Sequence, residues 1–190
     1  MKYAPRLINP TKVQTGKVRL SFANLFEPRA AKEGEDLKYS VDLLIPKDDK
    51  ENLATIEQAI ENAKQQGLEK KWNNKLPSNY GQPLKDGDDK DNDDAGVYAG
   101  HFFINAKSGA DEQPTLLDRD KEPVTDGKEI YSGCYARAIL RFYPYKVSGN
   151  NGVSCILDGV QKLEDGTALG GRGNVAQEFD EIEDDEDFLN

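Results

Sequence analysis

The sequence predicts a β-rich α+β fold in which five or six antiparallel strands form a small barrel or sandwich beside one main helix. Three observations support this fold class. Several segments alternate apolar and polar residues with a period of two, which is typical of half-buried strands. Residues 49–70 instead repeat their apolar residues at steps of three and four. The chain has 190 residues, 36% of them hydrophobic, which suits one domain with a modest core.

Two segments near the N-terminus, residues 17–27 and 38–45, show the strand alternation clearly. A proline follows each segment, and the charged, glycine-containing stretch between them suits a loop. We therefore expect a β-hairpin that buries one face of each strand. The residues expected on the buried faces are Val18, Leu20, Phe22, Tyr39, Val41, Leu43 and Ile45.

A single amphipathic helix is expected over residues 49–70. Asp48 followed by Glu51 resembles a capping box at its start, and Gly67 marks its expected C-terminal region. The spacing of the apolar residues places them on one face of the helix. That face would be formed by Leu53, Ile56, Ile60 and Ala63.

Three further strands are expected in the C-terminal half, at residues 98–107, 133–145 and 153–163. A glycine- and asparagine-rich turn at 148–152 joins the last two, which predicts a second hairpin. Residues 115–125 form a short excursion before it.

The strand at 133–145 carries the strongest functional signal, because its two faces differ in composition. One face is small and apolar and suits a core: Cys134, Ala136, Ala138, Leu140 and Phe142. The other face interleaves aromatic and cationic residues: Tyr135, Arg137, Ile139, Arg141 and Tyr143. Aromatic rings stack on unpaired bases and guanidinium groups bind phosphates, so this face has the composition of a surface for single-stranded nucleic acid.

Two other groups combine a ring with cations. Phe103 and Lys107 share one face of the strand at 98–107, and Trp72 follows Lys70 and Lys71 directly. The residues alone leave a structural interpretation open. Aromatic residues favour strands in general, so the alternation of Tyr and Arg could equally serve cross-strand packing or lie beneath a second helix.

The net charge of −10 argues at first against a nucleic-acid partner, but the charge is unevenly distributed. Residues 86–100 carry −5 and residues 177–190 carry −8, so the remainder of the chain is about +3. The body of the protein is therefore slightly basic, and its average charge is misleading.

We divide the chain into a domain at 1–176 and an acidic tail at 177–190, which its charge density predicts to be disordered. The tail also contains apolar residues that solubility does not require, which favours an interaction role. Its expected contact residues are Asp184, Asp185, Glu186, Asp187 and Phe188. The acidic loop at 85–96 resembles a calcium loop in composition but lacks its twelfth-position glutamate and flanking helices, so we interpret it as a solvated loop without metal.

The sequence offers little support for an enzyme. It has one histidine, no nucleotide-binding glycine motif and no nucleophile elbow, and Asp118 and Asp120 lie in a charged, solvated loop. Cys134 and Cys155 have no metal-binding spacing and form no disulfide framework. No apolar run suits a membrane helix or signal peptide, so we expect a cytoplasmic protein without a cofactor or metal.

Several motifs occur in a characteristic order along nearly the whole chain. They are Leu116–Arg119, Ile130–Tyr135 with the strand that follows it, Asn151–Val153, Leu169–Arg172 and the closing acidic tail. In this order they resemble the bacteriophage single-stranded-DNA-binding proteins of the OB-fold type. The resemblance implies an OB-like barrel that binds single-stranded DNA without sequence preference during phage replication, recombination and repair in the host bacterial cytoplasm. It also implies an acidic tail ending in or near an aromatic residue; here Phe188 is not the last residue.

Under this interpretation the tail would compete with DNA for the groove and, once displaced, recruit replication proteins such as a polymerase or a primase-helicase. A homodimer is compatible with the sequence. The main alternative is a protein–protein adaptor whose tail binds a basic partner and whose barrel binds no nucleic acid. A nuclease with a carboxylate-bound divalent metal is a third alternative.

Overall fold

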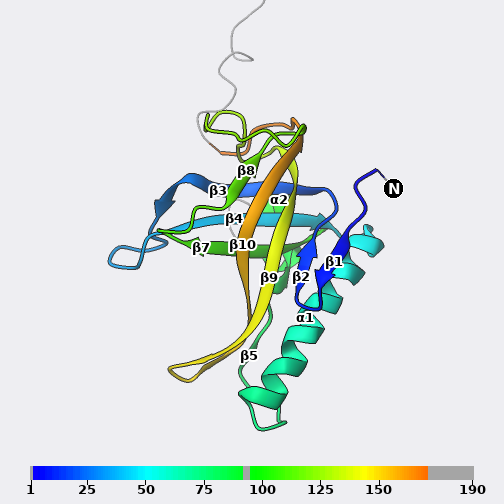
Figure 1. Ribbon diagram of the computed structural model, residues 1–190, viewed down its shortest axis with the longest axis vertical. Helices are drawn as coiled ribbons and strands as arrows, with labels where there is room; N and C mark the ends of the chain where they lie inside the picture. Colours follow the sequence, from blue (N-terminus) through cyan, green and yellow to red (C-terminus); the bar gives the residue numbers. More distant parts are fainter. Residues whose placement is uncertain (1, 92–94, 171–190) are drawn as a thin grey trace, which may run out of the picture.

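The computed structural model describes residues 2–91 and 95–170 (Figure 1). Within these residues, ten strands belong to one mixed sheet, beside one long helix, α1 (Lys50–Lys70), and two short helices, η1 (Gly87–Asp89) and α2 (Ala95–Tyr98). The strands are β1 (Arg6–Asn9), β2 (Lys12–Gln14), β3 (Val18–Arg29), β4 (Lys38–Pro46), β5 (Tyr80–Gly81), β6 (Leu84–Asp86), β7 (His101–Gly109), β8 (Thr115–Leu117), β9 (Tyr135–Val147) and β10 (Asn150–Glu164).

The expected N-terminal hairpin is confirmed as the antiparallel pair β3–β4. Its buried face forms as predicted except at Phe22, which is 51% exposed because the register of β3 shifts between Ser21 and Asn24. The opposite face of β4 is less exposed than predicted. Asp42 and Leu44 are buried there, since Tyr98 of α2 covers this end of the strand and donates a hydrogen bond to Asp42.

Helix α1 lies along one side of the sheet and buries its predicted apolar face against β9 and its neighbours (Figure 1). Its N-cap is Asp49 rather than Asp48: the Asp49 carboxylate accepts a hydrogen bond from the Asn52 backbone N–H at 3.3 Å. Gly67 does not end the helix. It is buried under the ring of Trp72, where a side chain would collide with the ring.

Five of the strands pair in a closed cycle, which we call the pairing ring. In it, β9 pairs with β3, β3 with β4, β4 with β7, β7 with β10, and β10 with β9. The link between β7 and β10 consists of one parallel residue pair, Ile156 opposite Lys107. The prediction of an antiparallel barrel with five or six strands is therefore corrected: the sheet has ten strands, three of its pairings are parallel, and it is not a clear barrel.

The short strands β1, β2, β5, β6 and β8 were not predicted, because two to four residues are too few for a detectable alternation. The two long C-terminal strands agree with prediction. The apolar face of β9, from Ala136 to Phe142, and Cys134 just before the strand are at most 2% exposed and form the centre of the core. Burial raises the pKa of the Cys134 and Cys155 thiols, so both are protonated core residues.

The first part of the predicted acidic loop lies beside β7, where residues 84–89 form β6 and η1. The Lys47 ammonium lies 2.6 Å from a carboxylate oxygen of Asp86 and 2.6 Å from one of Asp88. These hydrogen bonds lower the pKa of both carboxyls. Lys47 thus ties two carboxylates of this loop to the end of β4. In the described residues, no helix is long and apolar enough to span a membrane.

Candidate nucleic-acid interface

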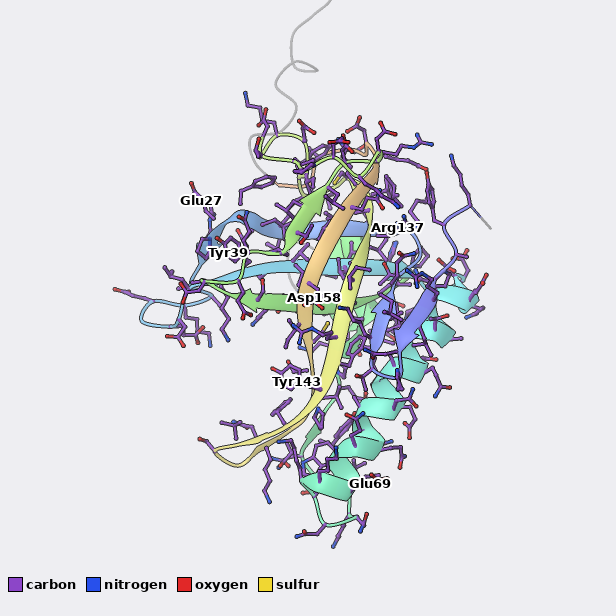
Figure 2. All side chains as sticks on the ribbon, viewed as in Figure 1. Glu27, Tyr39, Glu69, Arg137, Tyr143 and Asp158 are labelled. Carbon is purple, nitrogen blue, oxygen red and sulfur yellow. The ribbon has the colours of Figure 1, made fainter. Side chains whose placement is uncertain are left out.

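The outer face of β9 presents the predicted aromatic and cationic side chains in the predicted order. Tyr135, Arg137 and Ile139 are partly exposed, whereas Arg141 and Tyr143 are exposed. Tyr143 exposes 40% of its surface (Figure 2). The alternation in the sequence therefore identified correctly which side chains of β9 point away from the core.

Arg141 is not a free cation. Its Nε and Nη2 donate hydrogen bonds to the two carboxylate oxygens of Asp158, at 2.7 and 2.8 Å, and Lys12 Nζ lies 3.2 Å from the same carboxylate. Burial alone would raise the pKa of Asp158, but the hydrogen bonds from Arg141 and Lys12 lower it below its ordinary value. This group of two cations and one anion has a net charge of +1 at neutral pH.

Arg137 is held by a neutral partner. Its Nε donates to Gln161 Oε1 at 2.8 Å, and Gln161 in turn donates to the backbone carbonyls of Asp118 and Arg119. No acidic side chain pairs with Arg137 within the described residues. Its guanidinium charge is therefore fixed in position and uncompensated, which suits contact with a phosphate.

Tyr135 lies at the opposite end of β9 between two cations. Lys17 Nζ is 5.2 Å and the Arg19 guanidinium 5.8 Å from its ring centroid. Arg19 also donates to the carbonyls of Gly133 and Thr167, which fixes its position. Lys17 also forms an ion pair with Glu164 at 3.4 Å, so the positive charge beside the ring comes mainly from Arg19.

The sheet register places predicted residues of β9 and β7 on one face of the sheet. Arg141 lies opposite Ile156 of β10, which lies opposite Lys107 of β7; Lys107 lies opposite Ser40 of β4, and Ser40 opposite Asn24 of β3. Residues opposite each other share a face of a sheet. These five residues, which we call the cross-strand row, therefore cross the outer face of all five strands of the pairing ring.

Two predicted rings lie in the interior instead. Trp72 is 5% exposed and packs edge-on against Tyr80 at 5.8 Å, and Phe103 is 8% exposed and packs edge-on against Tyr98 at 5.0 Å. Neither ring has an exposed face on which a base could stack. The prediction that Trp72 and Phe103 are surface stacking residues is therefore corrected: both are buried. The reason is tertiary packing: Trp72 covers Gly67, and α2 covers the face of β7 that carries Phe103.

Lys70 and Lys71 are exposed at the end of α1, next to Glu69 (Figure 2). They belong to α1 and its C-cap, not to the outer face of β9 or β7. The structure thus joins Arg141 and Lys107 through the cross-strand row but leaves these two lysines on another element.

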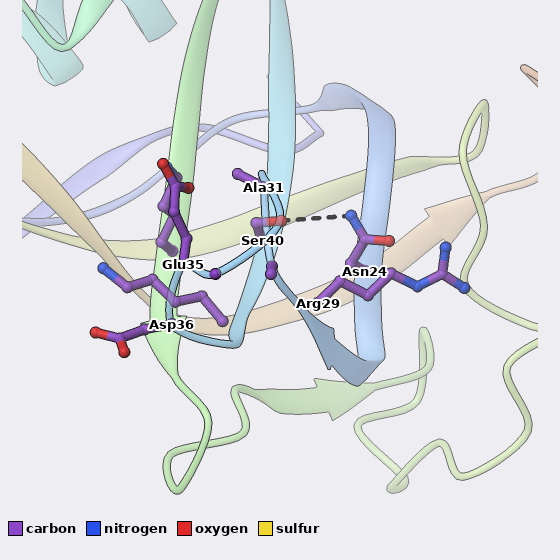
Figure 3. Close-up of a pocket in the computed structure, with 10 residues that line it drawn as sticks. Asn24, Arg29, Ala31, Glu35, Asp36 and Ser40 are labelled. Carbon is purple, nitrogen blue, oxygen red and sulfur yellow. Dashed lines mark hydrogen bonds between the residues drawn. The ribbon is translucent and has the colours of Figure 1, made fainter.

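Lys107 lines two hollows of the surface. One, of about 390 Å³, lies beside the β3–β4 hairpin and also contains Asn24, Arg29, Lys38 and Ser40, with Asn24 donating to Ser40 (Figure 3). Acidic groups from Glu35 and Asp36 line it too. The other hollow, of about 370 Å³, reaches toward the β9–β10 hairpin and contains Lys85, Asn105, Tyr145 and Ser154.

The sequence analysis did not identify the three cations and the tyrosine that line these hollows together with Lys107: Arg29, Lys38, Lys85 and Tyr145. A signal existed for Tyr145, because it continues the alternation of β9 one step beyond Tyr143. Arg29 is the last residue of β3 and Lys38 the first of β4, and the two lie opposite each other at the base of the loop that joins the strands. Lys85 could not be found, since it belongs to the short strand β6.

These features define a class of protein. The ring of five strands, in the order β3–β4–β7–β10–β9 with β7 and β10 parallel, places a cation-lined face of β4 and β7 between two hairpins. The fold is thus a mixed, β-rich sheet with one main helix. Its outer face combines aromatic rings with cations, which is the composition of a surface for single-stranded nucleic acid.

Comparison with known proteins identifies the family. Residues 11–189 match the family model of the Enterobacter phage Enc34 single-stranded-DNA-binding protein, and the chain belongs to this family. It is also 36% identical over 183 residues to putative protein p50 of Acyrthosiphon pisum secondary endosymbiont phage 1, covering 90% of this chain and 94% of that protein.

Two solved structures share the fold. The single-stranded DNA-binding protein from bacteriophage Enc34, in complex with single-stranded DNA, superimposes with a TM-score of 0.68 at 24% identity, covering 89% of this chain and 99% of that one. The single-stranded DNA-binding protein gp2.5 encoded by bacteriophage T7 superimposes with a TM-score of 0.61 at 16% identity, covering 90% and 98%. The resemblance seen in the sequence is thus confirmed at the level of the family.

Proposed function

We propose that the protein binds single-stranded DNA without sequence preference and takes part, as a non-catalytic protein, in phage DNA replication, recombination and repair in the host cytoplasm. The observation that carries the proposal is the cross-strand row, in which Arg141 and Lys107 lie on one face with Ile156 between them. Membership of the Enc34 family supports the same function.

The DNA backbone would follow the cations of the face. Lys107 contributes from the centre, Arg29 and Lys38 from the β3–β4 hairpin, and Lys85 from β6. Phosphate contacts of this kind carry no sequence information. Arg137 and the group around Arg141 extend the positive surface over β9.

The bases would stack on rings along the same path, of which Tyr143 is exposed and the others are partly exposed. Tyr143 and Tyr145 of β9 are the nearest candidates, and Tyr135 with its flanking cations serves the far end of the strand. Stacking tolerates every base because every base has a π-face. A surface of rings and cations therefore yields binding without sequence preference.

The acidic tail is proposed as a competitor for this face. Its contact residues, Asp184 to Phe188, lie outside the described residues, so the proposal rests on charge alone: residues 177–190 carry −8 beside a slightly basic body. A tethered polyanion raises the local concentration of negative charge near the groove. DNA that displaces the tail would release it for replication partners.

The test is a fluorescence anisotropy titration of labelled oligo-dT at two salt concentrations, with the wild type, Lys107→Gln and, as matched control, Lys64→Gln on α1. We expect wild-type binding that weakens as salt rises, because bound cations are released from the strand. Lys107→Gln should reduce the slope of log K against log salt by about 0.7, the value for one phosphate contact on a single strand. Lys64→Gln should keep the wild-type slope. Absence of wild-type binding at low salt would favour the adaptor.

A further inference from the structure

Phe22 combines exposure with an unusual backbone. It is 51% exposed, and its φ is +46°, in the left-handed region that a bulky aromatic residue rarely adopts. The strain arises at a β-bulge: Ser21 lies opposite Asp42 and Asn24 opposite Ser40, so Phe22 and Ala23 share the space opposite one residue of β4.

The surrounding structure holds the bulge in place. Ser132 Oγ accepts a hydrogen bond from the Ala23 N–H at 2.9 Å, and the Phe22 carbonyl accepts one from Asn24 Nδ2 at 3.2 Å. The backbone N–H of Leu20 donates to the Cys134 carbonyl, and the Leu20 carbonyl accepts from the Gly133 N–H. Backbone strain persists where neighbouring contacts over-determine it, and such positions cluster at ligand-binding sites.

Packing does not account for the ring. Ala23 and Phe26 contact the main hydrophobic core, but Phe22 belongs to neither hydrophobic cluster of the described residues. An exposed phenylalanine at a position that favours glycine costs stability without filling the core. A ligand that covers the ring would explain its presence.

The location of Phe22 indicates the ligand. Asn24, the end of the cross-strand row, lines the hollow beside Lys107 and also an open groove of about 1080 Å³ on the other side of β3. Phe22, Phe26 and Tyr131 line that groove. The path proposed for DNA over β4 and β7 therefore continues across β3 onto a surface with several rings.

A cation accompanies the ring. Lys90 Nζ lies 4.4 Å from the ring centroid of Tyr98, 4.9 Å from that of Phe103 and 6.0 Å from that of Phe22, so it bridges the buried ring pair and the exposed ring. No acidic side chain forms an ion pair with Lys90 within the described residues. Asp89 and Asp91 flank Lys90 in the sequence and line the same hollow, so a phosphate would have to approach Lys90 past these carboxylates. A ring beside an ammonium group can take a base on its face and the adjoining phosphate on its edge.

We infer that Phe22, held outward by the strained bulge of β3, is a base-stacking residue that extends the single-stranded DNA site beyond the β4–β7 face, with Lys90 as its phosphate contact. This inference rests on the proposed DNA binding and adds a subsite to it. It also gives the bulge a role: a regular β3 would turn Phe22 toward the core face, as the sequence alternation predicts.

The experiment compares Phe22→Gly and Phe22→Tyr with the wild type in oligo-dT titrations and thermal unfolding. Phe22→Gly removes the ring and the strain together, so we expect affinity to fall about fivefold to a hundredfold while Tm stays equal or rises. Phe22→Tyr keeps the ring and should keep wild-type affinity. Asn73→Gly, which relieves a φ of +51° beyond α1, is the backbone control and should leave affinity unchanged.

Salt dependence separates the two parts of the subsite. Loss of stacking should weaken binding equally at each salt concentration, so Phe22→Gly should keep the wild-type salt slope, whereas Lys90→Gln should lower it by about 0.7. Wild-type affinity in Phe22→Gly overturns the inference while leaving the proposed function intact. Absence of oligo-dT binding by the wild type overturns both.

Discussion

Arg141 and Asp158 form a two-point contact across the β9–β10 hairpin, with Nε and Nη2 of the arginine donating to both carboxylate oxygens. Lys12 approaches the same carboxylate from β2. A phosphate that binds either cation must therefore compete with an anion already in place. Asp158 thus orients Arg141 in the cross-strand row and at the same time lowers its availability for an anionic ligand.

This arrangement predicts the effect of Asp158→Asn. The amide removes the competing charge but preserves the shape of the side chain, so Arg141 and Lys12 become free for phosphate. We expect tighter binding of oligo-dT and a steeper salt dependence, with the slope increased by about 0.7 for each added phosphate contact. The measurement is an anisotropy titration at several salt concentrations.

The control for Asp158→Asn is Glu61→Gln on α1, which changes the net charge equally and lies near Lys64 instead. It separates local competition from a general effect of charge. If both variants tighten binding equally, the ion pair with Arg141 has no specific influence on the site.

The same carboxyl predicts a pH effect on stability. The pKa of Asp158 is lowered in the folded protein, so its pairing stabilises the fold above the unfolded-state pKa of about 4 and is lost as pH falls through the folded-state pKa. Wild type and Asp158→Asn should therefore differ in free energy of unfolding near neutral pH and converge in acid. Urea unfolding between about pH 2 and pH 7 measures this difference. A gap that stays constant over this range would contradict the assignment.

Tyr143 and Tyr135 test the outer face of β9. If their rings stack on bases, replacement of either by Ala should cost about 1–3 kcal/mol of binding free energy. Tyr143 should show the clearer effect because its side chain is 40% exposed, whereas Tyr135 is only partly exposed and is already flanked by Lys17 and Arg19. Circular dichroism would confirm that both variants fold. Full affinity in both would restrict the site to β3, β4 and β7.

The acidic tail predicts a salt-dependent inhibition. Deletion of residues 177–190 removes eight acidic side chains, so binding of single-stranded DNA should tighten, most strongly at low salt where charges are least screened. Titration of both forms with oligo-dT at low and high salt should show affinities that converge as salt rises. Equal or weaker binding after deletion would refute competition between the tail and DNA.

The sequence predicted the parts of the fold that depend on local periodicity. The two faces of β9 were assigned correctly because a long strand with one buried face shows its alternation directly, from Cys134 to Tyr143. The contact between Arg141 and Asp158 could not be predicted, since it depends on the register of a hairpin that contains a bulge after Leu157. Lys107 was recognised as a candidate, but its link to Arg141 through Ile156 required the parallel pairing of β7 and β10.

Burial of single aromatic residues was the main failure of the sequence interpretation. Trp72 follows two lysines and looked like an exposed ring, but the helix continues past Gly67 and the chain then folds back onto it. Phe22 showed the reverse error, because a bulge exposes a residue that the alternation places in the core. Both depend on contacts between residues that no periodic pattern encodes.

Gly67→Ala tests the structural role assigned to Trp72. An added Cβ would lie 2.4 Å from the Trp72 ring and 2.8 Å from Pro144, so the ring or the strand must move. Overpacking of this kind costs about 1–3 kcal/mol, which opposes the gain of about 1 kcal/mol from replacing a helical glycine. We expect a net loss of stability in urea unfolding, with exposed Glu69→Ala as the control that stays within about 0.5 kcal/mol of the wild type. A more stable Gly67→Ala would mean that Trp72 leaves the helix easily, and its ring would again become a candidate for stacking on DNA.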